Sequence, residues 1–335
     1  MGLELAELRL LGALRAEVTD ITLDVRVVGG RGSRRHARRL GARWIPSRGH
    51  TLPRLASSGA DLVHLIGLDS PPPRRKAFVA TVHDLSPLHY DDEVALPPWL
   101  GEIAERASLL LTPSGFTAGE LHRQLGVPPE RVRVFGGAAA LEASDAELLS
   151  PLELQQLGIE PPFVLRYGGY TKRKNLPLLL KAWAQVPAGT LVLAGPPQQA
   201  RKKILAEAPS LDRVVVLDYV PQTLLARLLR SADALVSTSS YEGFGLPPLE
   251  AMAAGTPVVA VSAPFVHELC SDAALLVEGR PDALADALRE VLADEELALR
   301  LRAAGLVRAA RFTWSGAASA VIGAYQSSVP QAMAP

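Results

Sequence analysis

Short runs of β-branched residues and leucine alternate along this chain with longer segments of helical spacing. Such alternation is typical of βαβ units, in which a crossover helix brings the chain back to the end of the sheet where the previous strand began, so that the next strand runs parallel to it. Parallel sheets of this kind are covered by helices on both faces. The sequence therefore predicts an α/β protein. In the first part we expect strands at 23–28, 62–66, 78–82, 109–111 and 132–135, with helices at 5–16, 34–41, 97–106 and 117–125.

A polar, proline-containing interval at residues 142–162 interrupts this alternation, which then begins again. A length of 335 residues fits two domains, because single hydrophobic cores rarely grow beyond about 250–300 residues. We expect domains at residues 1–155 and 156–312, followed by a helical tail at 313–335. In the second domain we expect strands at 163–167, 190–193, 214–217, 234–237, 257–262 and 274–277, and helices ending at 185 and spanning 198–207, 223–230, 247–254 and 281 onward.

The charge balance and the cysteine content limit the partners. The 35 basic and 35 acidic residues cancel, so no overall charge attracts nucleic acid and an anionic partner must meet a local patch. The single Cys270 excludes an intramolecular disulfide and a cysteine-rich zinc site. We expect a cytoplasmic protein without a signal peptide or membrane span. The basic segment Arg31–Arg43 fits peripheral contact with anionic lipid at the inner membrane face, the binding of an anionic acceptor, or a plain solvated helix.

The segment 237–262, STSSYEGFGLPPLEAMAAGTPVVAVS, carries the most informative motif. Gly243 and Gly245 permit a tight turn and the close approach of a ligand to the backbone. A helix starting at Gly245–Leu246 directs free amides and the positive end of its dipole outward, which predicts an anion site. Glu242 precedes that site and Glu250 follows it. On these residues alone, a solvated pair of glutamates at a common strand-to-helix turn is an equal alternative.

Two further groups of residues come at the expected carboxyl ends of strands. Gly168 and Gly169 are followed by the cations of Lys172–Lys174, which can neutralise a diphosphate without a metal. The alternative is a basic surface turn. His83 follows an earlier strand, where its ring can hydrogen-bond a sugar hydroxyl or the hydroxyl that is transferred. The alternative for this side chain is a structural histidine.

These motifs closely resemble those of the retaining glycosyltransferases of family four, which have the GT-B fold. The family signature places two glutamates seven residues apart within E-G-F-G-L-P-x-L-E-A-M-A-x-G-x-P-V-V, and Glu242 and Glu250 occupy the two acidic positions. Residues 81–85 are similar to the histidine-aspartate-leucine segment of the family, and 168–175 to its glycine-then-R-K-N segment. The resemblance implies two Rossmann-like domains with parallel sheets that face each other across a cleft, and a C-terminal helix that packs back on the first domain.

The resemblance also implies roles for individual residues. Glu242 is expected to contact the donor sugar, and Glu250 to hydrogen-bond the ribose. Lys174 and Arg173 are expected to bind the diphosphate, and His83 to lie near the reacting sugar. Catalysis is thus assigned to His83, Glu242, Arg173 and Lys174, and donor binding to Gly169, Arg173, Lys174, Glu242, Gly243, Phe244, Gly245, Leu246 and Glu250.

The implied activity is the retaining transfer of a hexose, with mannose as the first expectation, from a nucleotide-diphosphate sugar to a glycan or lipid-linked acceptor. The leaving phosphate takes the acceptor proton in such a reaction, so we assign no covalent nucleophile and expect no metal or other cofactor. Family members usually begin with a strand and a glycine-rich loop. This sequence begins with helical spacing, so we expect both to be missing. A catalytically silent nucleotide-sugar-binding subunit and a nucleotide-sugar epimerase of the same fold remain open alternatives.

Overall fold

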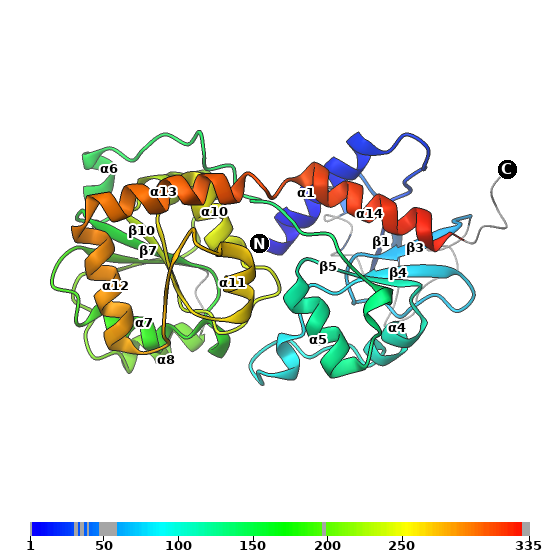
Figure 1. Cartoon of the computed structure of the whole chain (residues 1–335), viewed down its shortest axis with the longest axis horizontal. Coiled ribbons are helices and arrows are strands. Elements are labelled where there is room, and N and C mark those ends of the chain that lie inside the picture. The colour runs from blue at the N-terminus through cyan, green and yellow to red at the C-terminus, as the bar shows by residue number, and fades with distance from the viewer. Residues whose placement is uncertain are drawn as a thin grey trace. The chain divides into compact units, whose positions relative to one another are not determined.

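The computed structural model describes residues 2–29, 33, 37–38, 40–46, 59–195 and 199–329. The chain divides into two compact units, each built around a parallel sheet with packed helices (Figure 1). Unit 1 comprises Met1–Gly137 and Thr313–Pro335, and unit 2 comprises Ala138–Phe312. The parallel sheets confirm the α/β prediction. The division falls after Gly137, however, and not after residue 155 as the polar interval suggested.

The reason for this earlier division is that the polar interval packs on unit 2. The short helix α6 (Pro151–Gln156) lies beside α9 (Gln222–Ser231). Arg227 Nη1 of α9 is 2.7 Å from Glu153 Oε1, and the Leu149 amide donates to Ser231 Oγ at 2.8 Å. The interval is therefore part of the second unit and not a free linker.

The sheet of unit 2 has six parallel strands in the order β12-β11-β10-β7-β8-β9. The order reverses between β10 and β7, which makes this the switch point of a doubly wound sheet, where ligands bind beyond the carboxyl ends of the strands. Each strand lies where the alternation predicted it. Their bounds are β7 (Phe163–Tyr167), β8 (Thr190–Ala194), β9 (Val214–Leu217), β10 (Ala234–Ser237), β11 (Val258–Val261) and β12 (Leu275–Val277).

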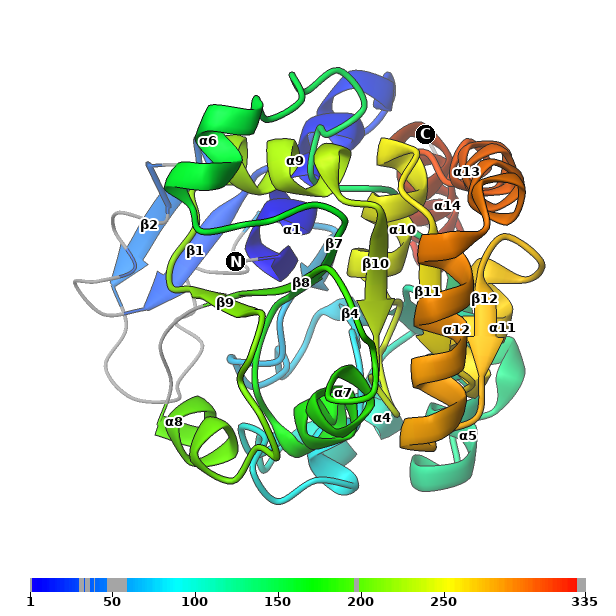
Figure 2. The same cartoon turned by 90° about the vertical axis from the view of Figure 1, so that its left-hand side faces the viewer.

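Helices cover both faces of this sheet (Figure 2). On one face lie α7 (Leu176–Trp183), α8 (Gln199–Ala206) and α12 (Pro281–Ala293), whose apolar side chains share a core with the strands. On the other lie α9 and α10 (Leu246–Ala254), and α10 packs against α13 (Glu295–Ala309). The sequence did not predict the short helix α11 (Pro264–Cys270), because seven residues hold barely two turns of the apolar period.

Unit 1 contains a four-stranded parallel sheet in the order β3-β4-β5-β6 and a parallel pair, β1 with β2. The strand β2 was not predicted, since its four residues end in proline. The expected helix at 34–41 and the basic segment Arg31–Arg43 lie only in part within the described residues, because 31–32, 34–36 and 39 fall outside them. The strands are β1 (Arg26–Gly29), β2 (Arg43–Pro46), β3 (Leu62–Leu65), β4 (Ala77–Thr81), β5 (Leu109–Thr112) and β6 (Val132–Val134).

The C-terminal helix α14 (Trp314–Ser328) belongs to unit 1, as the resemblance implied. It packs against α1 (Gly2–Glu17) and against the sheet, with Val321 of α14 and Leu14 of α1 in one buried cluster. This unit also contains α4 (Leu100–Arg106) and α5 (Gly115–Leu125), with short 3₁₀ turns at Ser86–Leu88 and Pro129–Arg131. None of the helices in the described ranges is long and apolar enough to span a bilayer.

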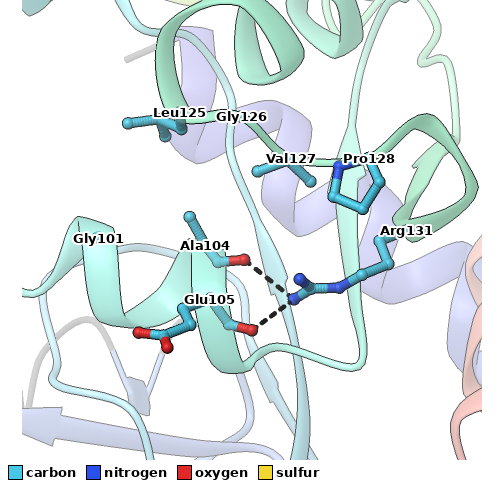
Figure 3. A pocket seen from close by; sticks show the side chains of 8 residues that line it. All are labelled: Gly101, Ala104, Glu105, Leu125, Gly126, Val127, Pro128 and Arg131. Carbon is cyan, nitrogen blue, oxygen red and sulfur yellow. Dashed lines mark hydrogen bonds between the residues drawn. The ribbon is translucent and has the colours of Figure 1, made fainter.

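A pocket of about 280 Å³ lies in unit 1 beside the end of α4 (Figure 3). The Arg131 guanidinium borders it and donates to the carbonyl oxygens of Ala104 at 2.9 Å, Glu105 at 2.9 Å and Ala107 at 2.6 Å. The last carbonyl groups of a helix have no partner within the helix. Arg131 therefore caps α4. The lining residues are Gly101, Ala104, Glu105, Leu125, Gly126, Val127, Pro128 and Arg131.

Replacing this cap should destabilise unit 1. We expect Arg131→Ala to lower the free energy of unfolding by about 1–2 kcal/mol, because the freed carbonyl groups lose charge-assisted hydrogen bonds. Urea denaturation measures the change, with Arg300→Ala on the exposed side of α13 as the matched control. Equal unfolding midpoints for the Arg131 variant and the unaltered chain would contradict the capping role.

Candidate functional site

Two of the predicted motifs meet at the switch point of unit 2. The loop after β7 contains a 3₁₀ turn at Lys172–Lys174, and the loop after β10 leads into α10. Ser240 N donates to the carbonyl oxygen of Arg173 at 2.8 Å, and Thr238 Oγ1 donates to that of Lys174 at 2.7 Å. The backbones of the basic turn and of the glutamate loop are therefore joined directly, which fixes the positions from which their side chains extend.

The charged side chains of these two loops form an ion triad of Arg173, Lys174 and Glu242. Arg173 Nη1 lies 2.5 Å from Glu242 Oε2 and also donates to the Tyr241 carbonyl at 3.0 Å. Lys174 Nζ donates to Glu242 Oε1. The three side chains are 12–15% exposed, so the triad is largely buried but reaches the surface. One anion between two cations leaves this place with a positive charge.

Burial alone would raise the pKa of Glu242, because it penalises the charged form. The charges of Lys174 and Arg173, with hydrogen bonds from Lys174 and Ser239, outweigh that effect and lower the pKa of Glu242 to about 2. Burial lowers the pKa of Lys174, against the opposing attraction of Glu242. Glu242 is therefore an anion at neutral pH and cannot act there as a proton donor.

The glycines after β7 are held by a buried arginine inside that strand. Arg166 is 4% exposed, donates to the carbonyl oxygens of Gly168 and Gly169, and places its guanidinium carbon 4.7 Å from the centre of the Tyr170 ring. A Cβ at Gly195 would lie 2.4 Å from the Gly168 carbonyl oxygen. Sequence reasoning missed Arg166. The available signal was a charged residue within an otherwise apolar strand, which demands a partner.

The loop between the two glutamates has the predicted geometry. Gly245 has φ +99°, and a Cβ there would come 2.9 Å from Leu269 Cδ2, so only glycine fits. The helix α10 begins at Leu246, with prolines in its first turn. The Phe244 ring packs edge-on against Phe312, with 5.7 Å between ring centres. The amides at the start of α10 therefore belong to a loop of fixed shape.

Glu250, the second glutamate, lies buried within α10, and the hydrogen bonds to its carboxylate come from within unit 2. Oε1 accepts from the Leu141 amide at 3.1 Å, and Oε2 accepts from the Tyr167 hydroxyl. Burial raises the pKa of Glu250, and hydrogen bonds from Tyr167 and from the Leu141 and Ala140 amides offset this only in part. The carboxylate thus ties the end of β7 to the first residues of unit 2. Its expected role at the ribose stays a prediction.

His83 belongs to unit 1, where it follows β4. Its Nε2 is buried, lies 3.6 Å from Glu7 Oε1 and has no hydrogen-bond partner among the described residues. The neighbouring His64, which sequence reasoning missed, contacts the Tyr325 hydroxyl at 2.7 Å and Thr81 Oγ1 at 2.8 Å. Burial and the charge of His83 lower the pKa of His64 to about 3, so its ring is neutral. Within the described ranges, no three His, Cys, Asp or Glu side chains group as a metal site.

Several solved structures share this architecture over nearly the whole chain. Anabaena HepE in complex with UDP and glucose has a TM-score of 0.75 at 18% identity, covering 98% of this chain and 96% of that one. WaaG, a glycosyltransferase involved in lipopolysaccharide biosynthesis, has a TM-score of 0.69 at 16% identity, covering 96% and 95%. At these identities the likeness shows the fold alone, and that fold is GT-B.

The curated proteins with similar sequences include glycosyltransferases, the class of enzyme that the motifs resemble. The O-antigen chain mannosyltransferase B of Escherichia coli is 30% identical over 273 residues, which cover 76% of this chain and 71% of that protein. The D-inositol 3-phosphate glycosyltransferase of Xylanimonas cellulosilytica is 29% identical over 241 residues, and the chain spans only 58% of its length.

Both halves of the chain match glycosyltransferase families. Residues 9–138 match Glycosyltransferase Family 4, and residues 152–307 match Glycosyl transferases group 1. The second match contains the basic turn, the glutamate loop and α10, which together form the ion triad and its surroundings. The chain therefore belongs to the group 1 glycosyltransferases.

Proposed function

We propose that the protein is a retaining glycosyltransferase that moves a hexosyl group, with mannose as the first candidate, from a nucleotide-diphosphate sugar to a glycan or lipid-linked acceptor. The Arg173–Lys174–Glu242 triad at the switch point carries this proposal, because it gathers positive charge where an α/β sheet binds its ligand. The names of mannosyltransferase relatives support the choice of sugar. The UDP and UDP-glucose complexes of HepE support a nucleotide-sugar donor.

The leaving group of such a reaction is a nucleoside diphosphate, whose negative charge grows as the bond to the sugar breaks. Arg173 and Lys174 supply hydrogen-bond donors for that charge, and the amides at the start of α10 add the positive end of the helix dipole. Glu242 holds both cations in place before the donor arrives. Groups fixed in this way need no reorganisation at the moment of reaction, which is the source of their catalytic effect.

Retention follows when the acceptor oxygen attacks the anomeric carbon from the side that the phosphate leaves. The bond from carbon to phosphate oxygen breaks, the bond to the acceptor oxygen forms, and the acceptor proton passes to the departing phosphate oxygen. This route needs neither a covalent nucleophile nor a metal. A Glu242 carboxylate engaged by two cations is a weak nucleophile, which agrees with this assignment. Glu242 would contact the donor sugar, Glu250 the ribose and His83 a sugar hydroxyl.

We place the reaction at the cytoplasmic side, with peripheral contact to anionic membrane through Arg31–Arg43 as part of the same proposal. An acceptor linked to lipid would then be presented at the membrane surface. A silent donor-binding subunit would share the donor site but lack turnover. Incubating the protein with GDP-mannose and lipid extracts, and following labelled sugar into product, separates the two functions.

The diphosphate assignment predicts a specific loss in one variant. We expect Lys174→Ala to weaken the binding of a nucleoside diphosphate at least about tenfold, because one charge-assisted hydrogen bond is removed from a partly buried site. Isothermal titration calorimetry measures the dissociation constant. The control is Lys181→Ala, an exposed cation on α7. Equal weakening in both variants, or none in either, would count against Lys174 as a diphosphate ligand.

The depressed pKa of Glu242 predicts how stability depends on pH. A carboxyl group with a pKa of about 2 in the folded chain, against an ordinary 4.5, contributes stability above pH 4.5, and that contribution is lost as the pH falls toward 2. At pH 7 we expect Glu242→Gln to be less stable than the unaltered chain by on the order of 2 kcal/mol. Urea denaturation at pH 7, 4.5 and 3 should show the difference shrinking with acidity. A difference that stays constant over this range would argue against the ion triad.

A further inference from the structure

The inward face of α1 carries a carboxylate, that of Glu7. The buried residues Leu10, Leu11 and Leu14 follow it at intervals of three, four and seven, the spacing of one face of a helix. Leu10 and Leu14 share a buried cluster with Val79 of β4, so this face of α1 packs on the sheet of unit 1. The Glu7 side chain is 24% exposed. A charged group that lies mostly below the surface needs a partner.

That partner is His83, which comes four residues after Val79 on the loop that follows β4. Its Nε2 lies 3.6 Å from Glu7 Oε1, and it makes no hydrogen bond to any residue that the structure describes. An N–H···O hydrogen bond spans about 2.7–3.2 Å, so an approach of about half an ångström would close this contact. Hydrogen bonds of catalytic groups are often long in the free enzyme and tighten when substrate binds.

Other polar groups near His83 are engaged elsewhere. The carboxylate of Asp84, the next residue, accepts through Oδ1 from the Ser86 amide at 3.0 Å and from the Ser86 hydroxyl at 2.7 Å. His64 has a hydroxyl group within hydrogen-bond distance of each of its ring nitrogens. Burial and the charge of His83 lower the pKa of His64 to about 3, so this ring brings no competing positive charge to Glu7.

A carboxylate at Nε2 determines what the opposite ring nitrogen can do. A neutral imidazole carries a proton on one nitrogen and a lone pair on the other, and a carboxylate only accepts hydrogen bonds. If Nε2 donates to Glu7, Nδ1 is therefore left as an acceptor. The His83 side chain is 22% exposed although Nε2 is covered, so its exposed surface belongs to other atoms. Such a ring suits a ligand that offers a hydroxyl proton.

We propose that Glu7 is a positioning residue, which accepts the Nε2–H of His83, fixes the orientation of the ring and leaves Nδ1 to accept a hydrogen bond from a sugar hydroxyl. This inference rests on the proposed function, which brings the sugar to His83. It adds a residue that lies outside every motif of the sequence, and it gives the direction of the hydrogen bond at the sugar. Glu7 touches no part of the sugar itself.

NMR of the full chain with labelled histidine nitrogens tests the contact without any substrate. An imidazole proton that is bonded to a carboxylate exchanges slowly with water and so gives a signal. We expect such a signal from His83 Nε2–H, identified by its absence in His83→Gln, and we expect Glu7→Ala to abolish it. A signal that survives in Glu7→Ala, or no signal from His83 in the unaltered chain, overturns the proposal.

Glu17→Ala is the matched control. It removes a carboxylate from the far end of the same helix, where Glu17 accepts from Ser315 Oγ at 2.6 Å. The control should keep the His83 signal, and circular dichroism shows that each variant is folded. Loss of the signal in folded Glu17→Ala as well would trace it to a general loosening of α1, which also overturns the proposal.

Turnover then shows whether Glu7 acts through His83. In the labelled-sugar assay with GDP-mannose, we expect Glu7→Ala to lower kcat about tenfold and to change the donor KM less than about threefold, because the bond that orients the ring is lost. In the His83→Ala background, Glu7→Ala should lower kcat no further, since no ring remains to be held. An equal loss in both backgrounds overturns the proposal. Where His83→Ala leaves no measurable turnover, the NMR result decides.

The outcomes separate this inference from the proposed function. If sugar is transferred and diphosphate binding depends on Lys174, but the His83 signal does not depend on Glu7, the proposed function stands and the positioning role is wrong. If the unaltered chain transfers no sugar, the proposed function fails, and the positioning role fails with it.

Discussion

The attraction between Glu242 and the two cations of the basic turn decides what this site can do. Without Glu242, Arg173 and Lys174 would face each other in a largely buried place, where like charges repel with little screening by solvent. With it, both are held where a diphosphate can be received. The same interaction keeps Glu242 ionised, so it cannot donate a proton at neutral pH, and a carboxylate with a pKa of about 2 is a weak base. Both properties agree with our proposal that the departing phosphate takes the proton. One pattern of contacts thus accounts for the affinity for an anion and for the retaining chemistry that we propose.

The backbone around the triad is as constrained as the charges. Gly245 permits the turn into α10 only because it has no side chain. The Arg166 guanidinium donates hydrogen bonds to the carbonyl oxygens of Gly168 and Gly169, so we assign it to holding this loop and not to binding the ligand. Glu250 ties Leu141 to Tyr167 in the same unit. A ribose that reached Glu250 would have to share a carboxylate already engaged by these donors, and the raised pKa of this group reflects how deeply it is buried.

The sequence predicted most of the architecture because apolar periodicity is a local property. The parallel strands of unit 2, the start of α10 and the C-terminal helix all follow from runs of residues close together in the chain. Features that depend on distant partners could not be predicted in this way. The composition of the interval before residue 155 is typical of a linker, but Glu153 and Leu149 within it hydrogen-bond to Arg227 and Ser231, which come more than 70 residues later. His64 likewise has partners that no local pattern predicts, because Thr81 lies on β4 and Tyr325 on α14.

A structure determined with an intact nucleotide sugar tests the central claim most directly. It should show the diphosphate oxygens within hydrogen-bond distance of Lys174 Nζ and Arg173 Nη1, beside the first amides of α10, with Glu242 still paired with both cations. A nucleotide sugar bound elsewhere, with no phosphate oxygen near Lys174 or Arg173, would contradict it.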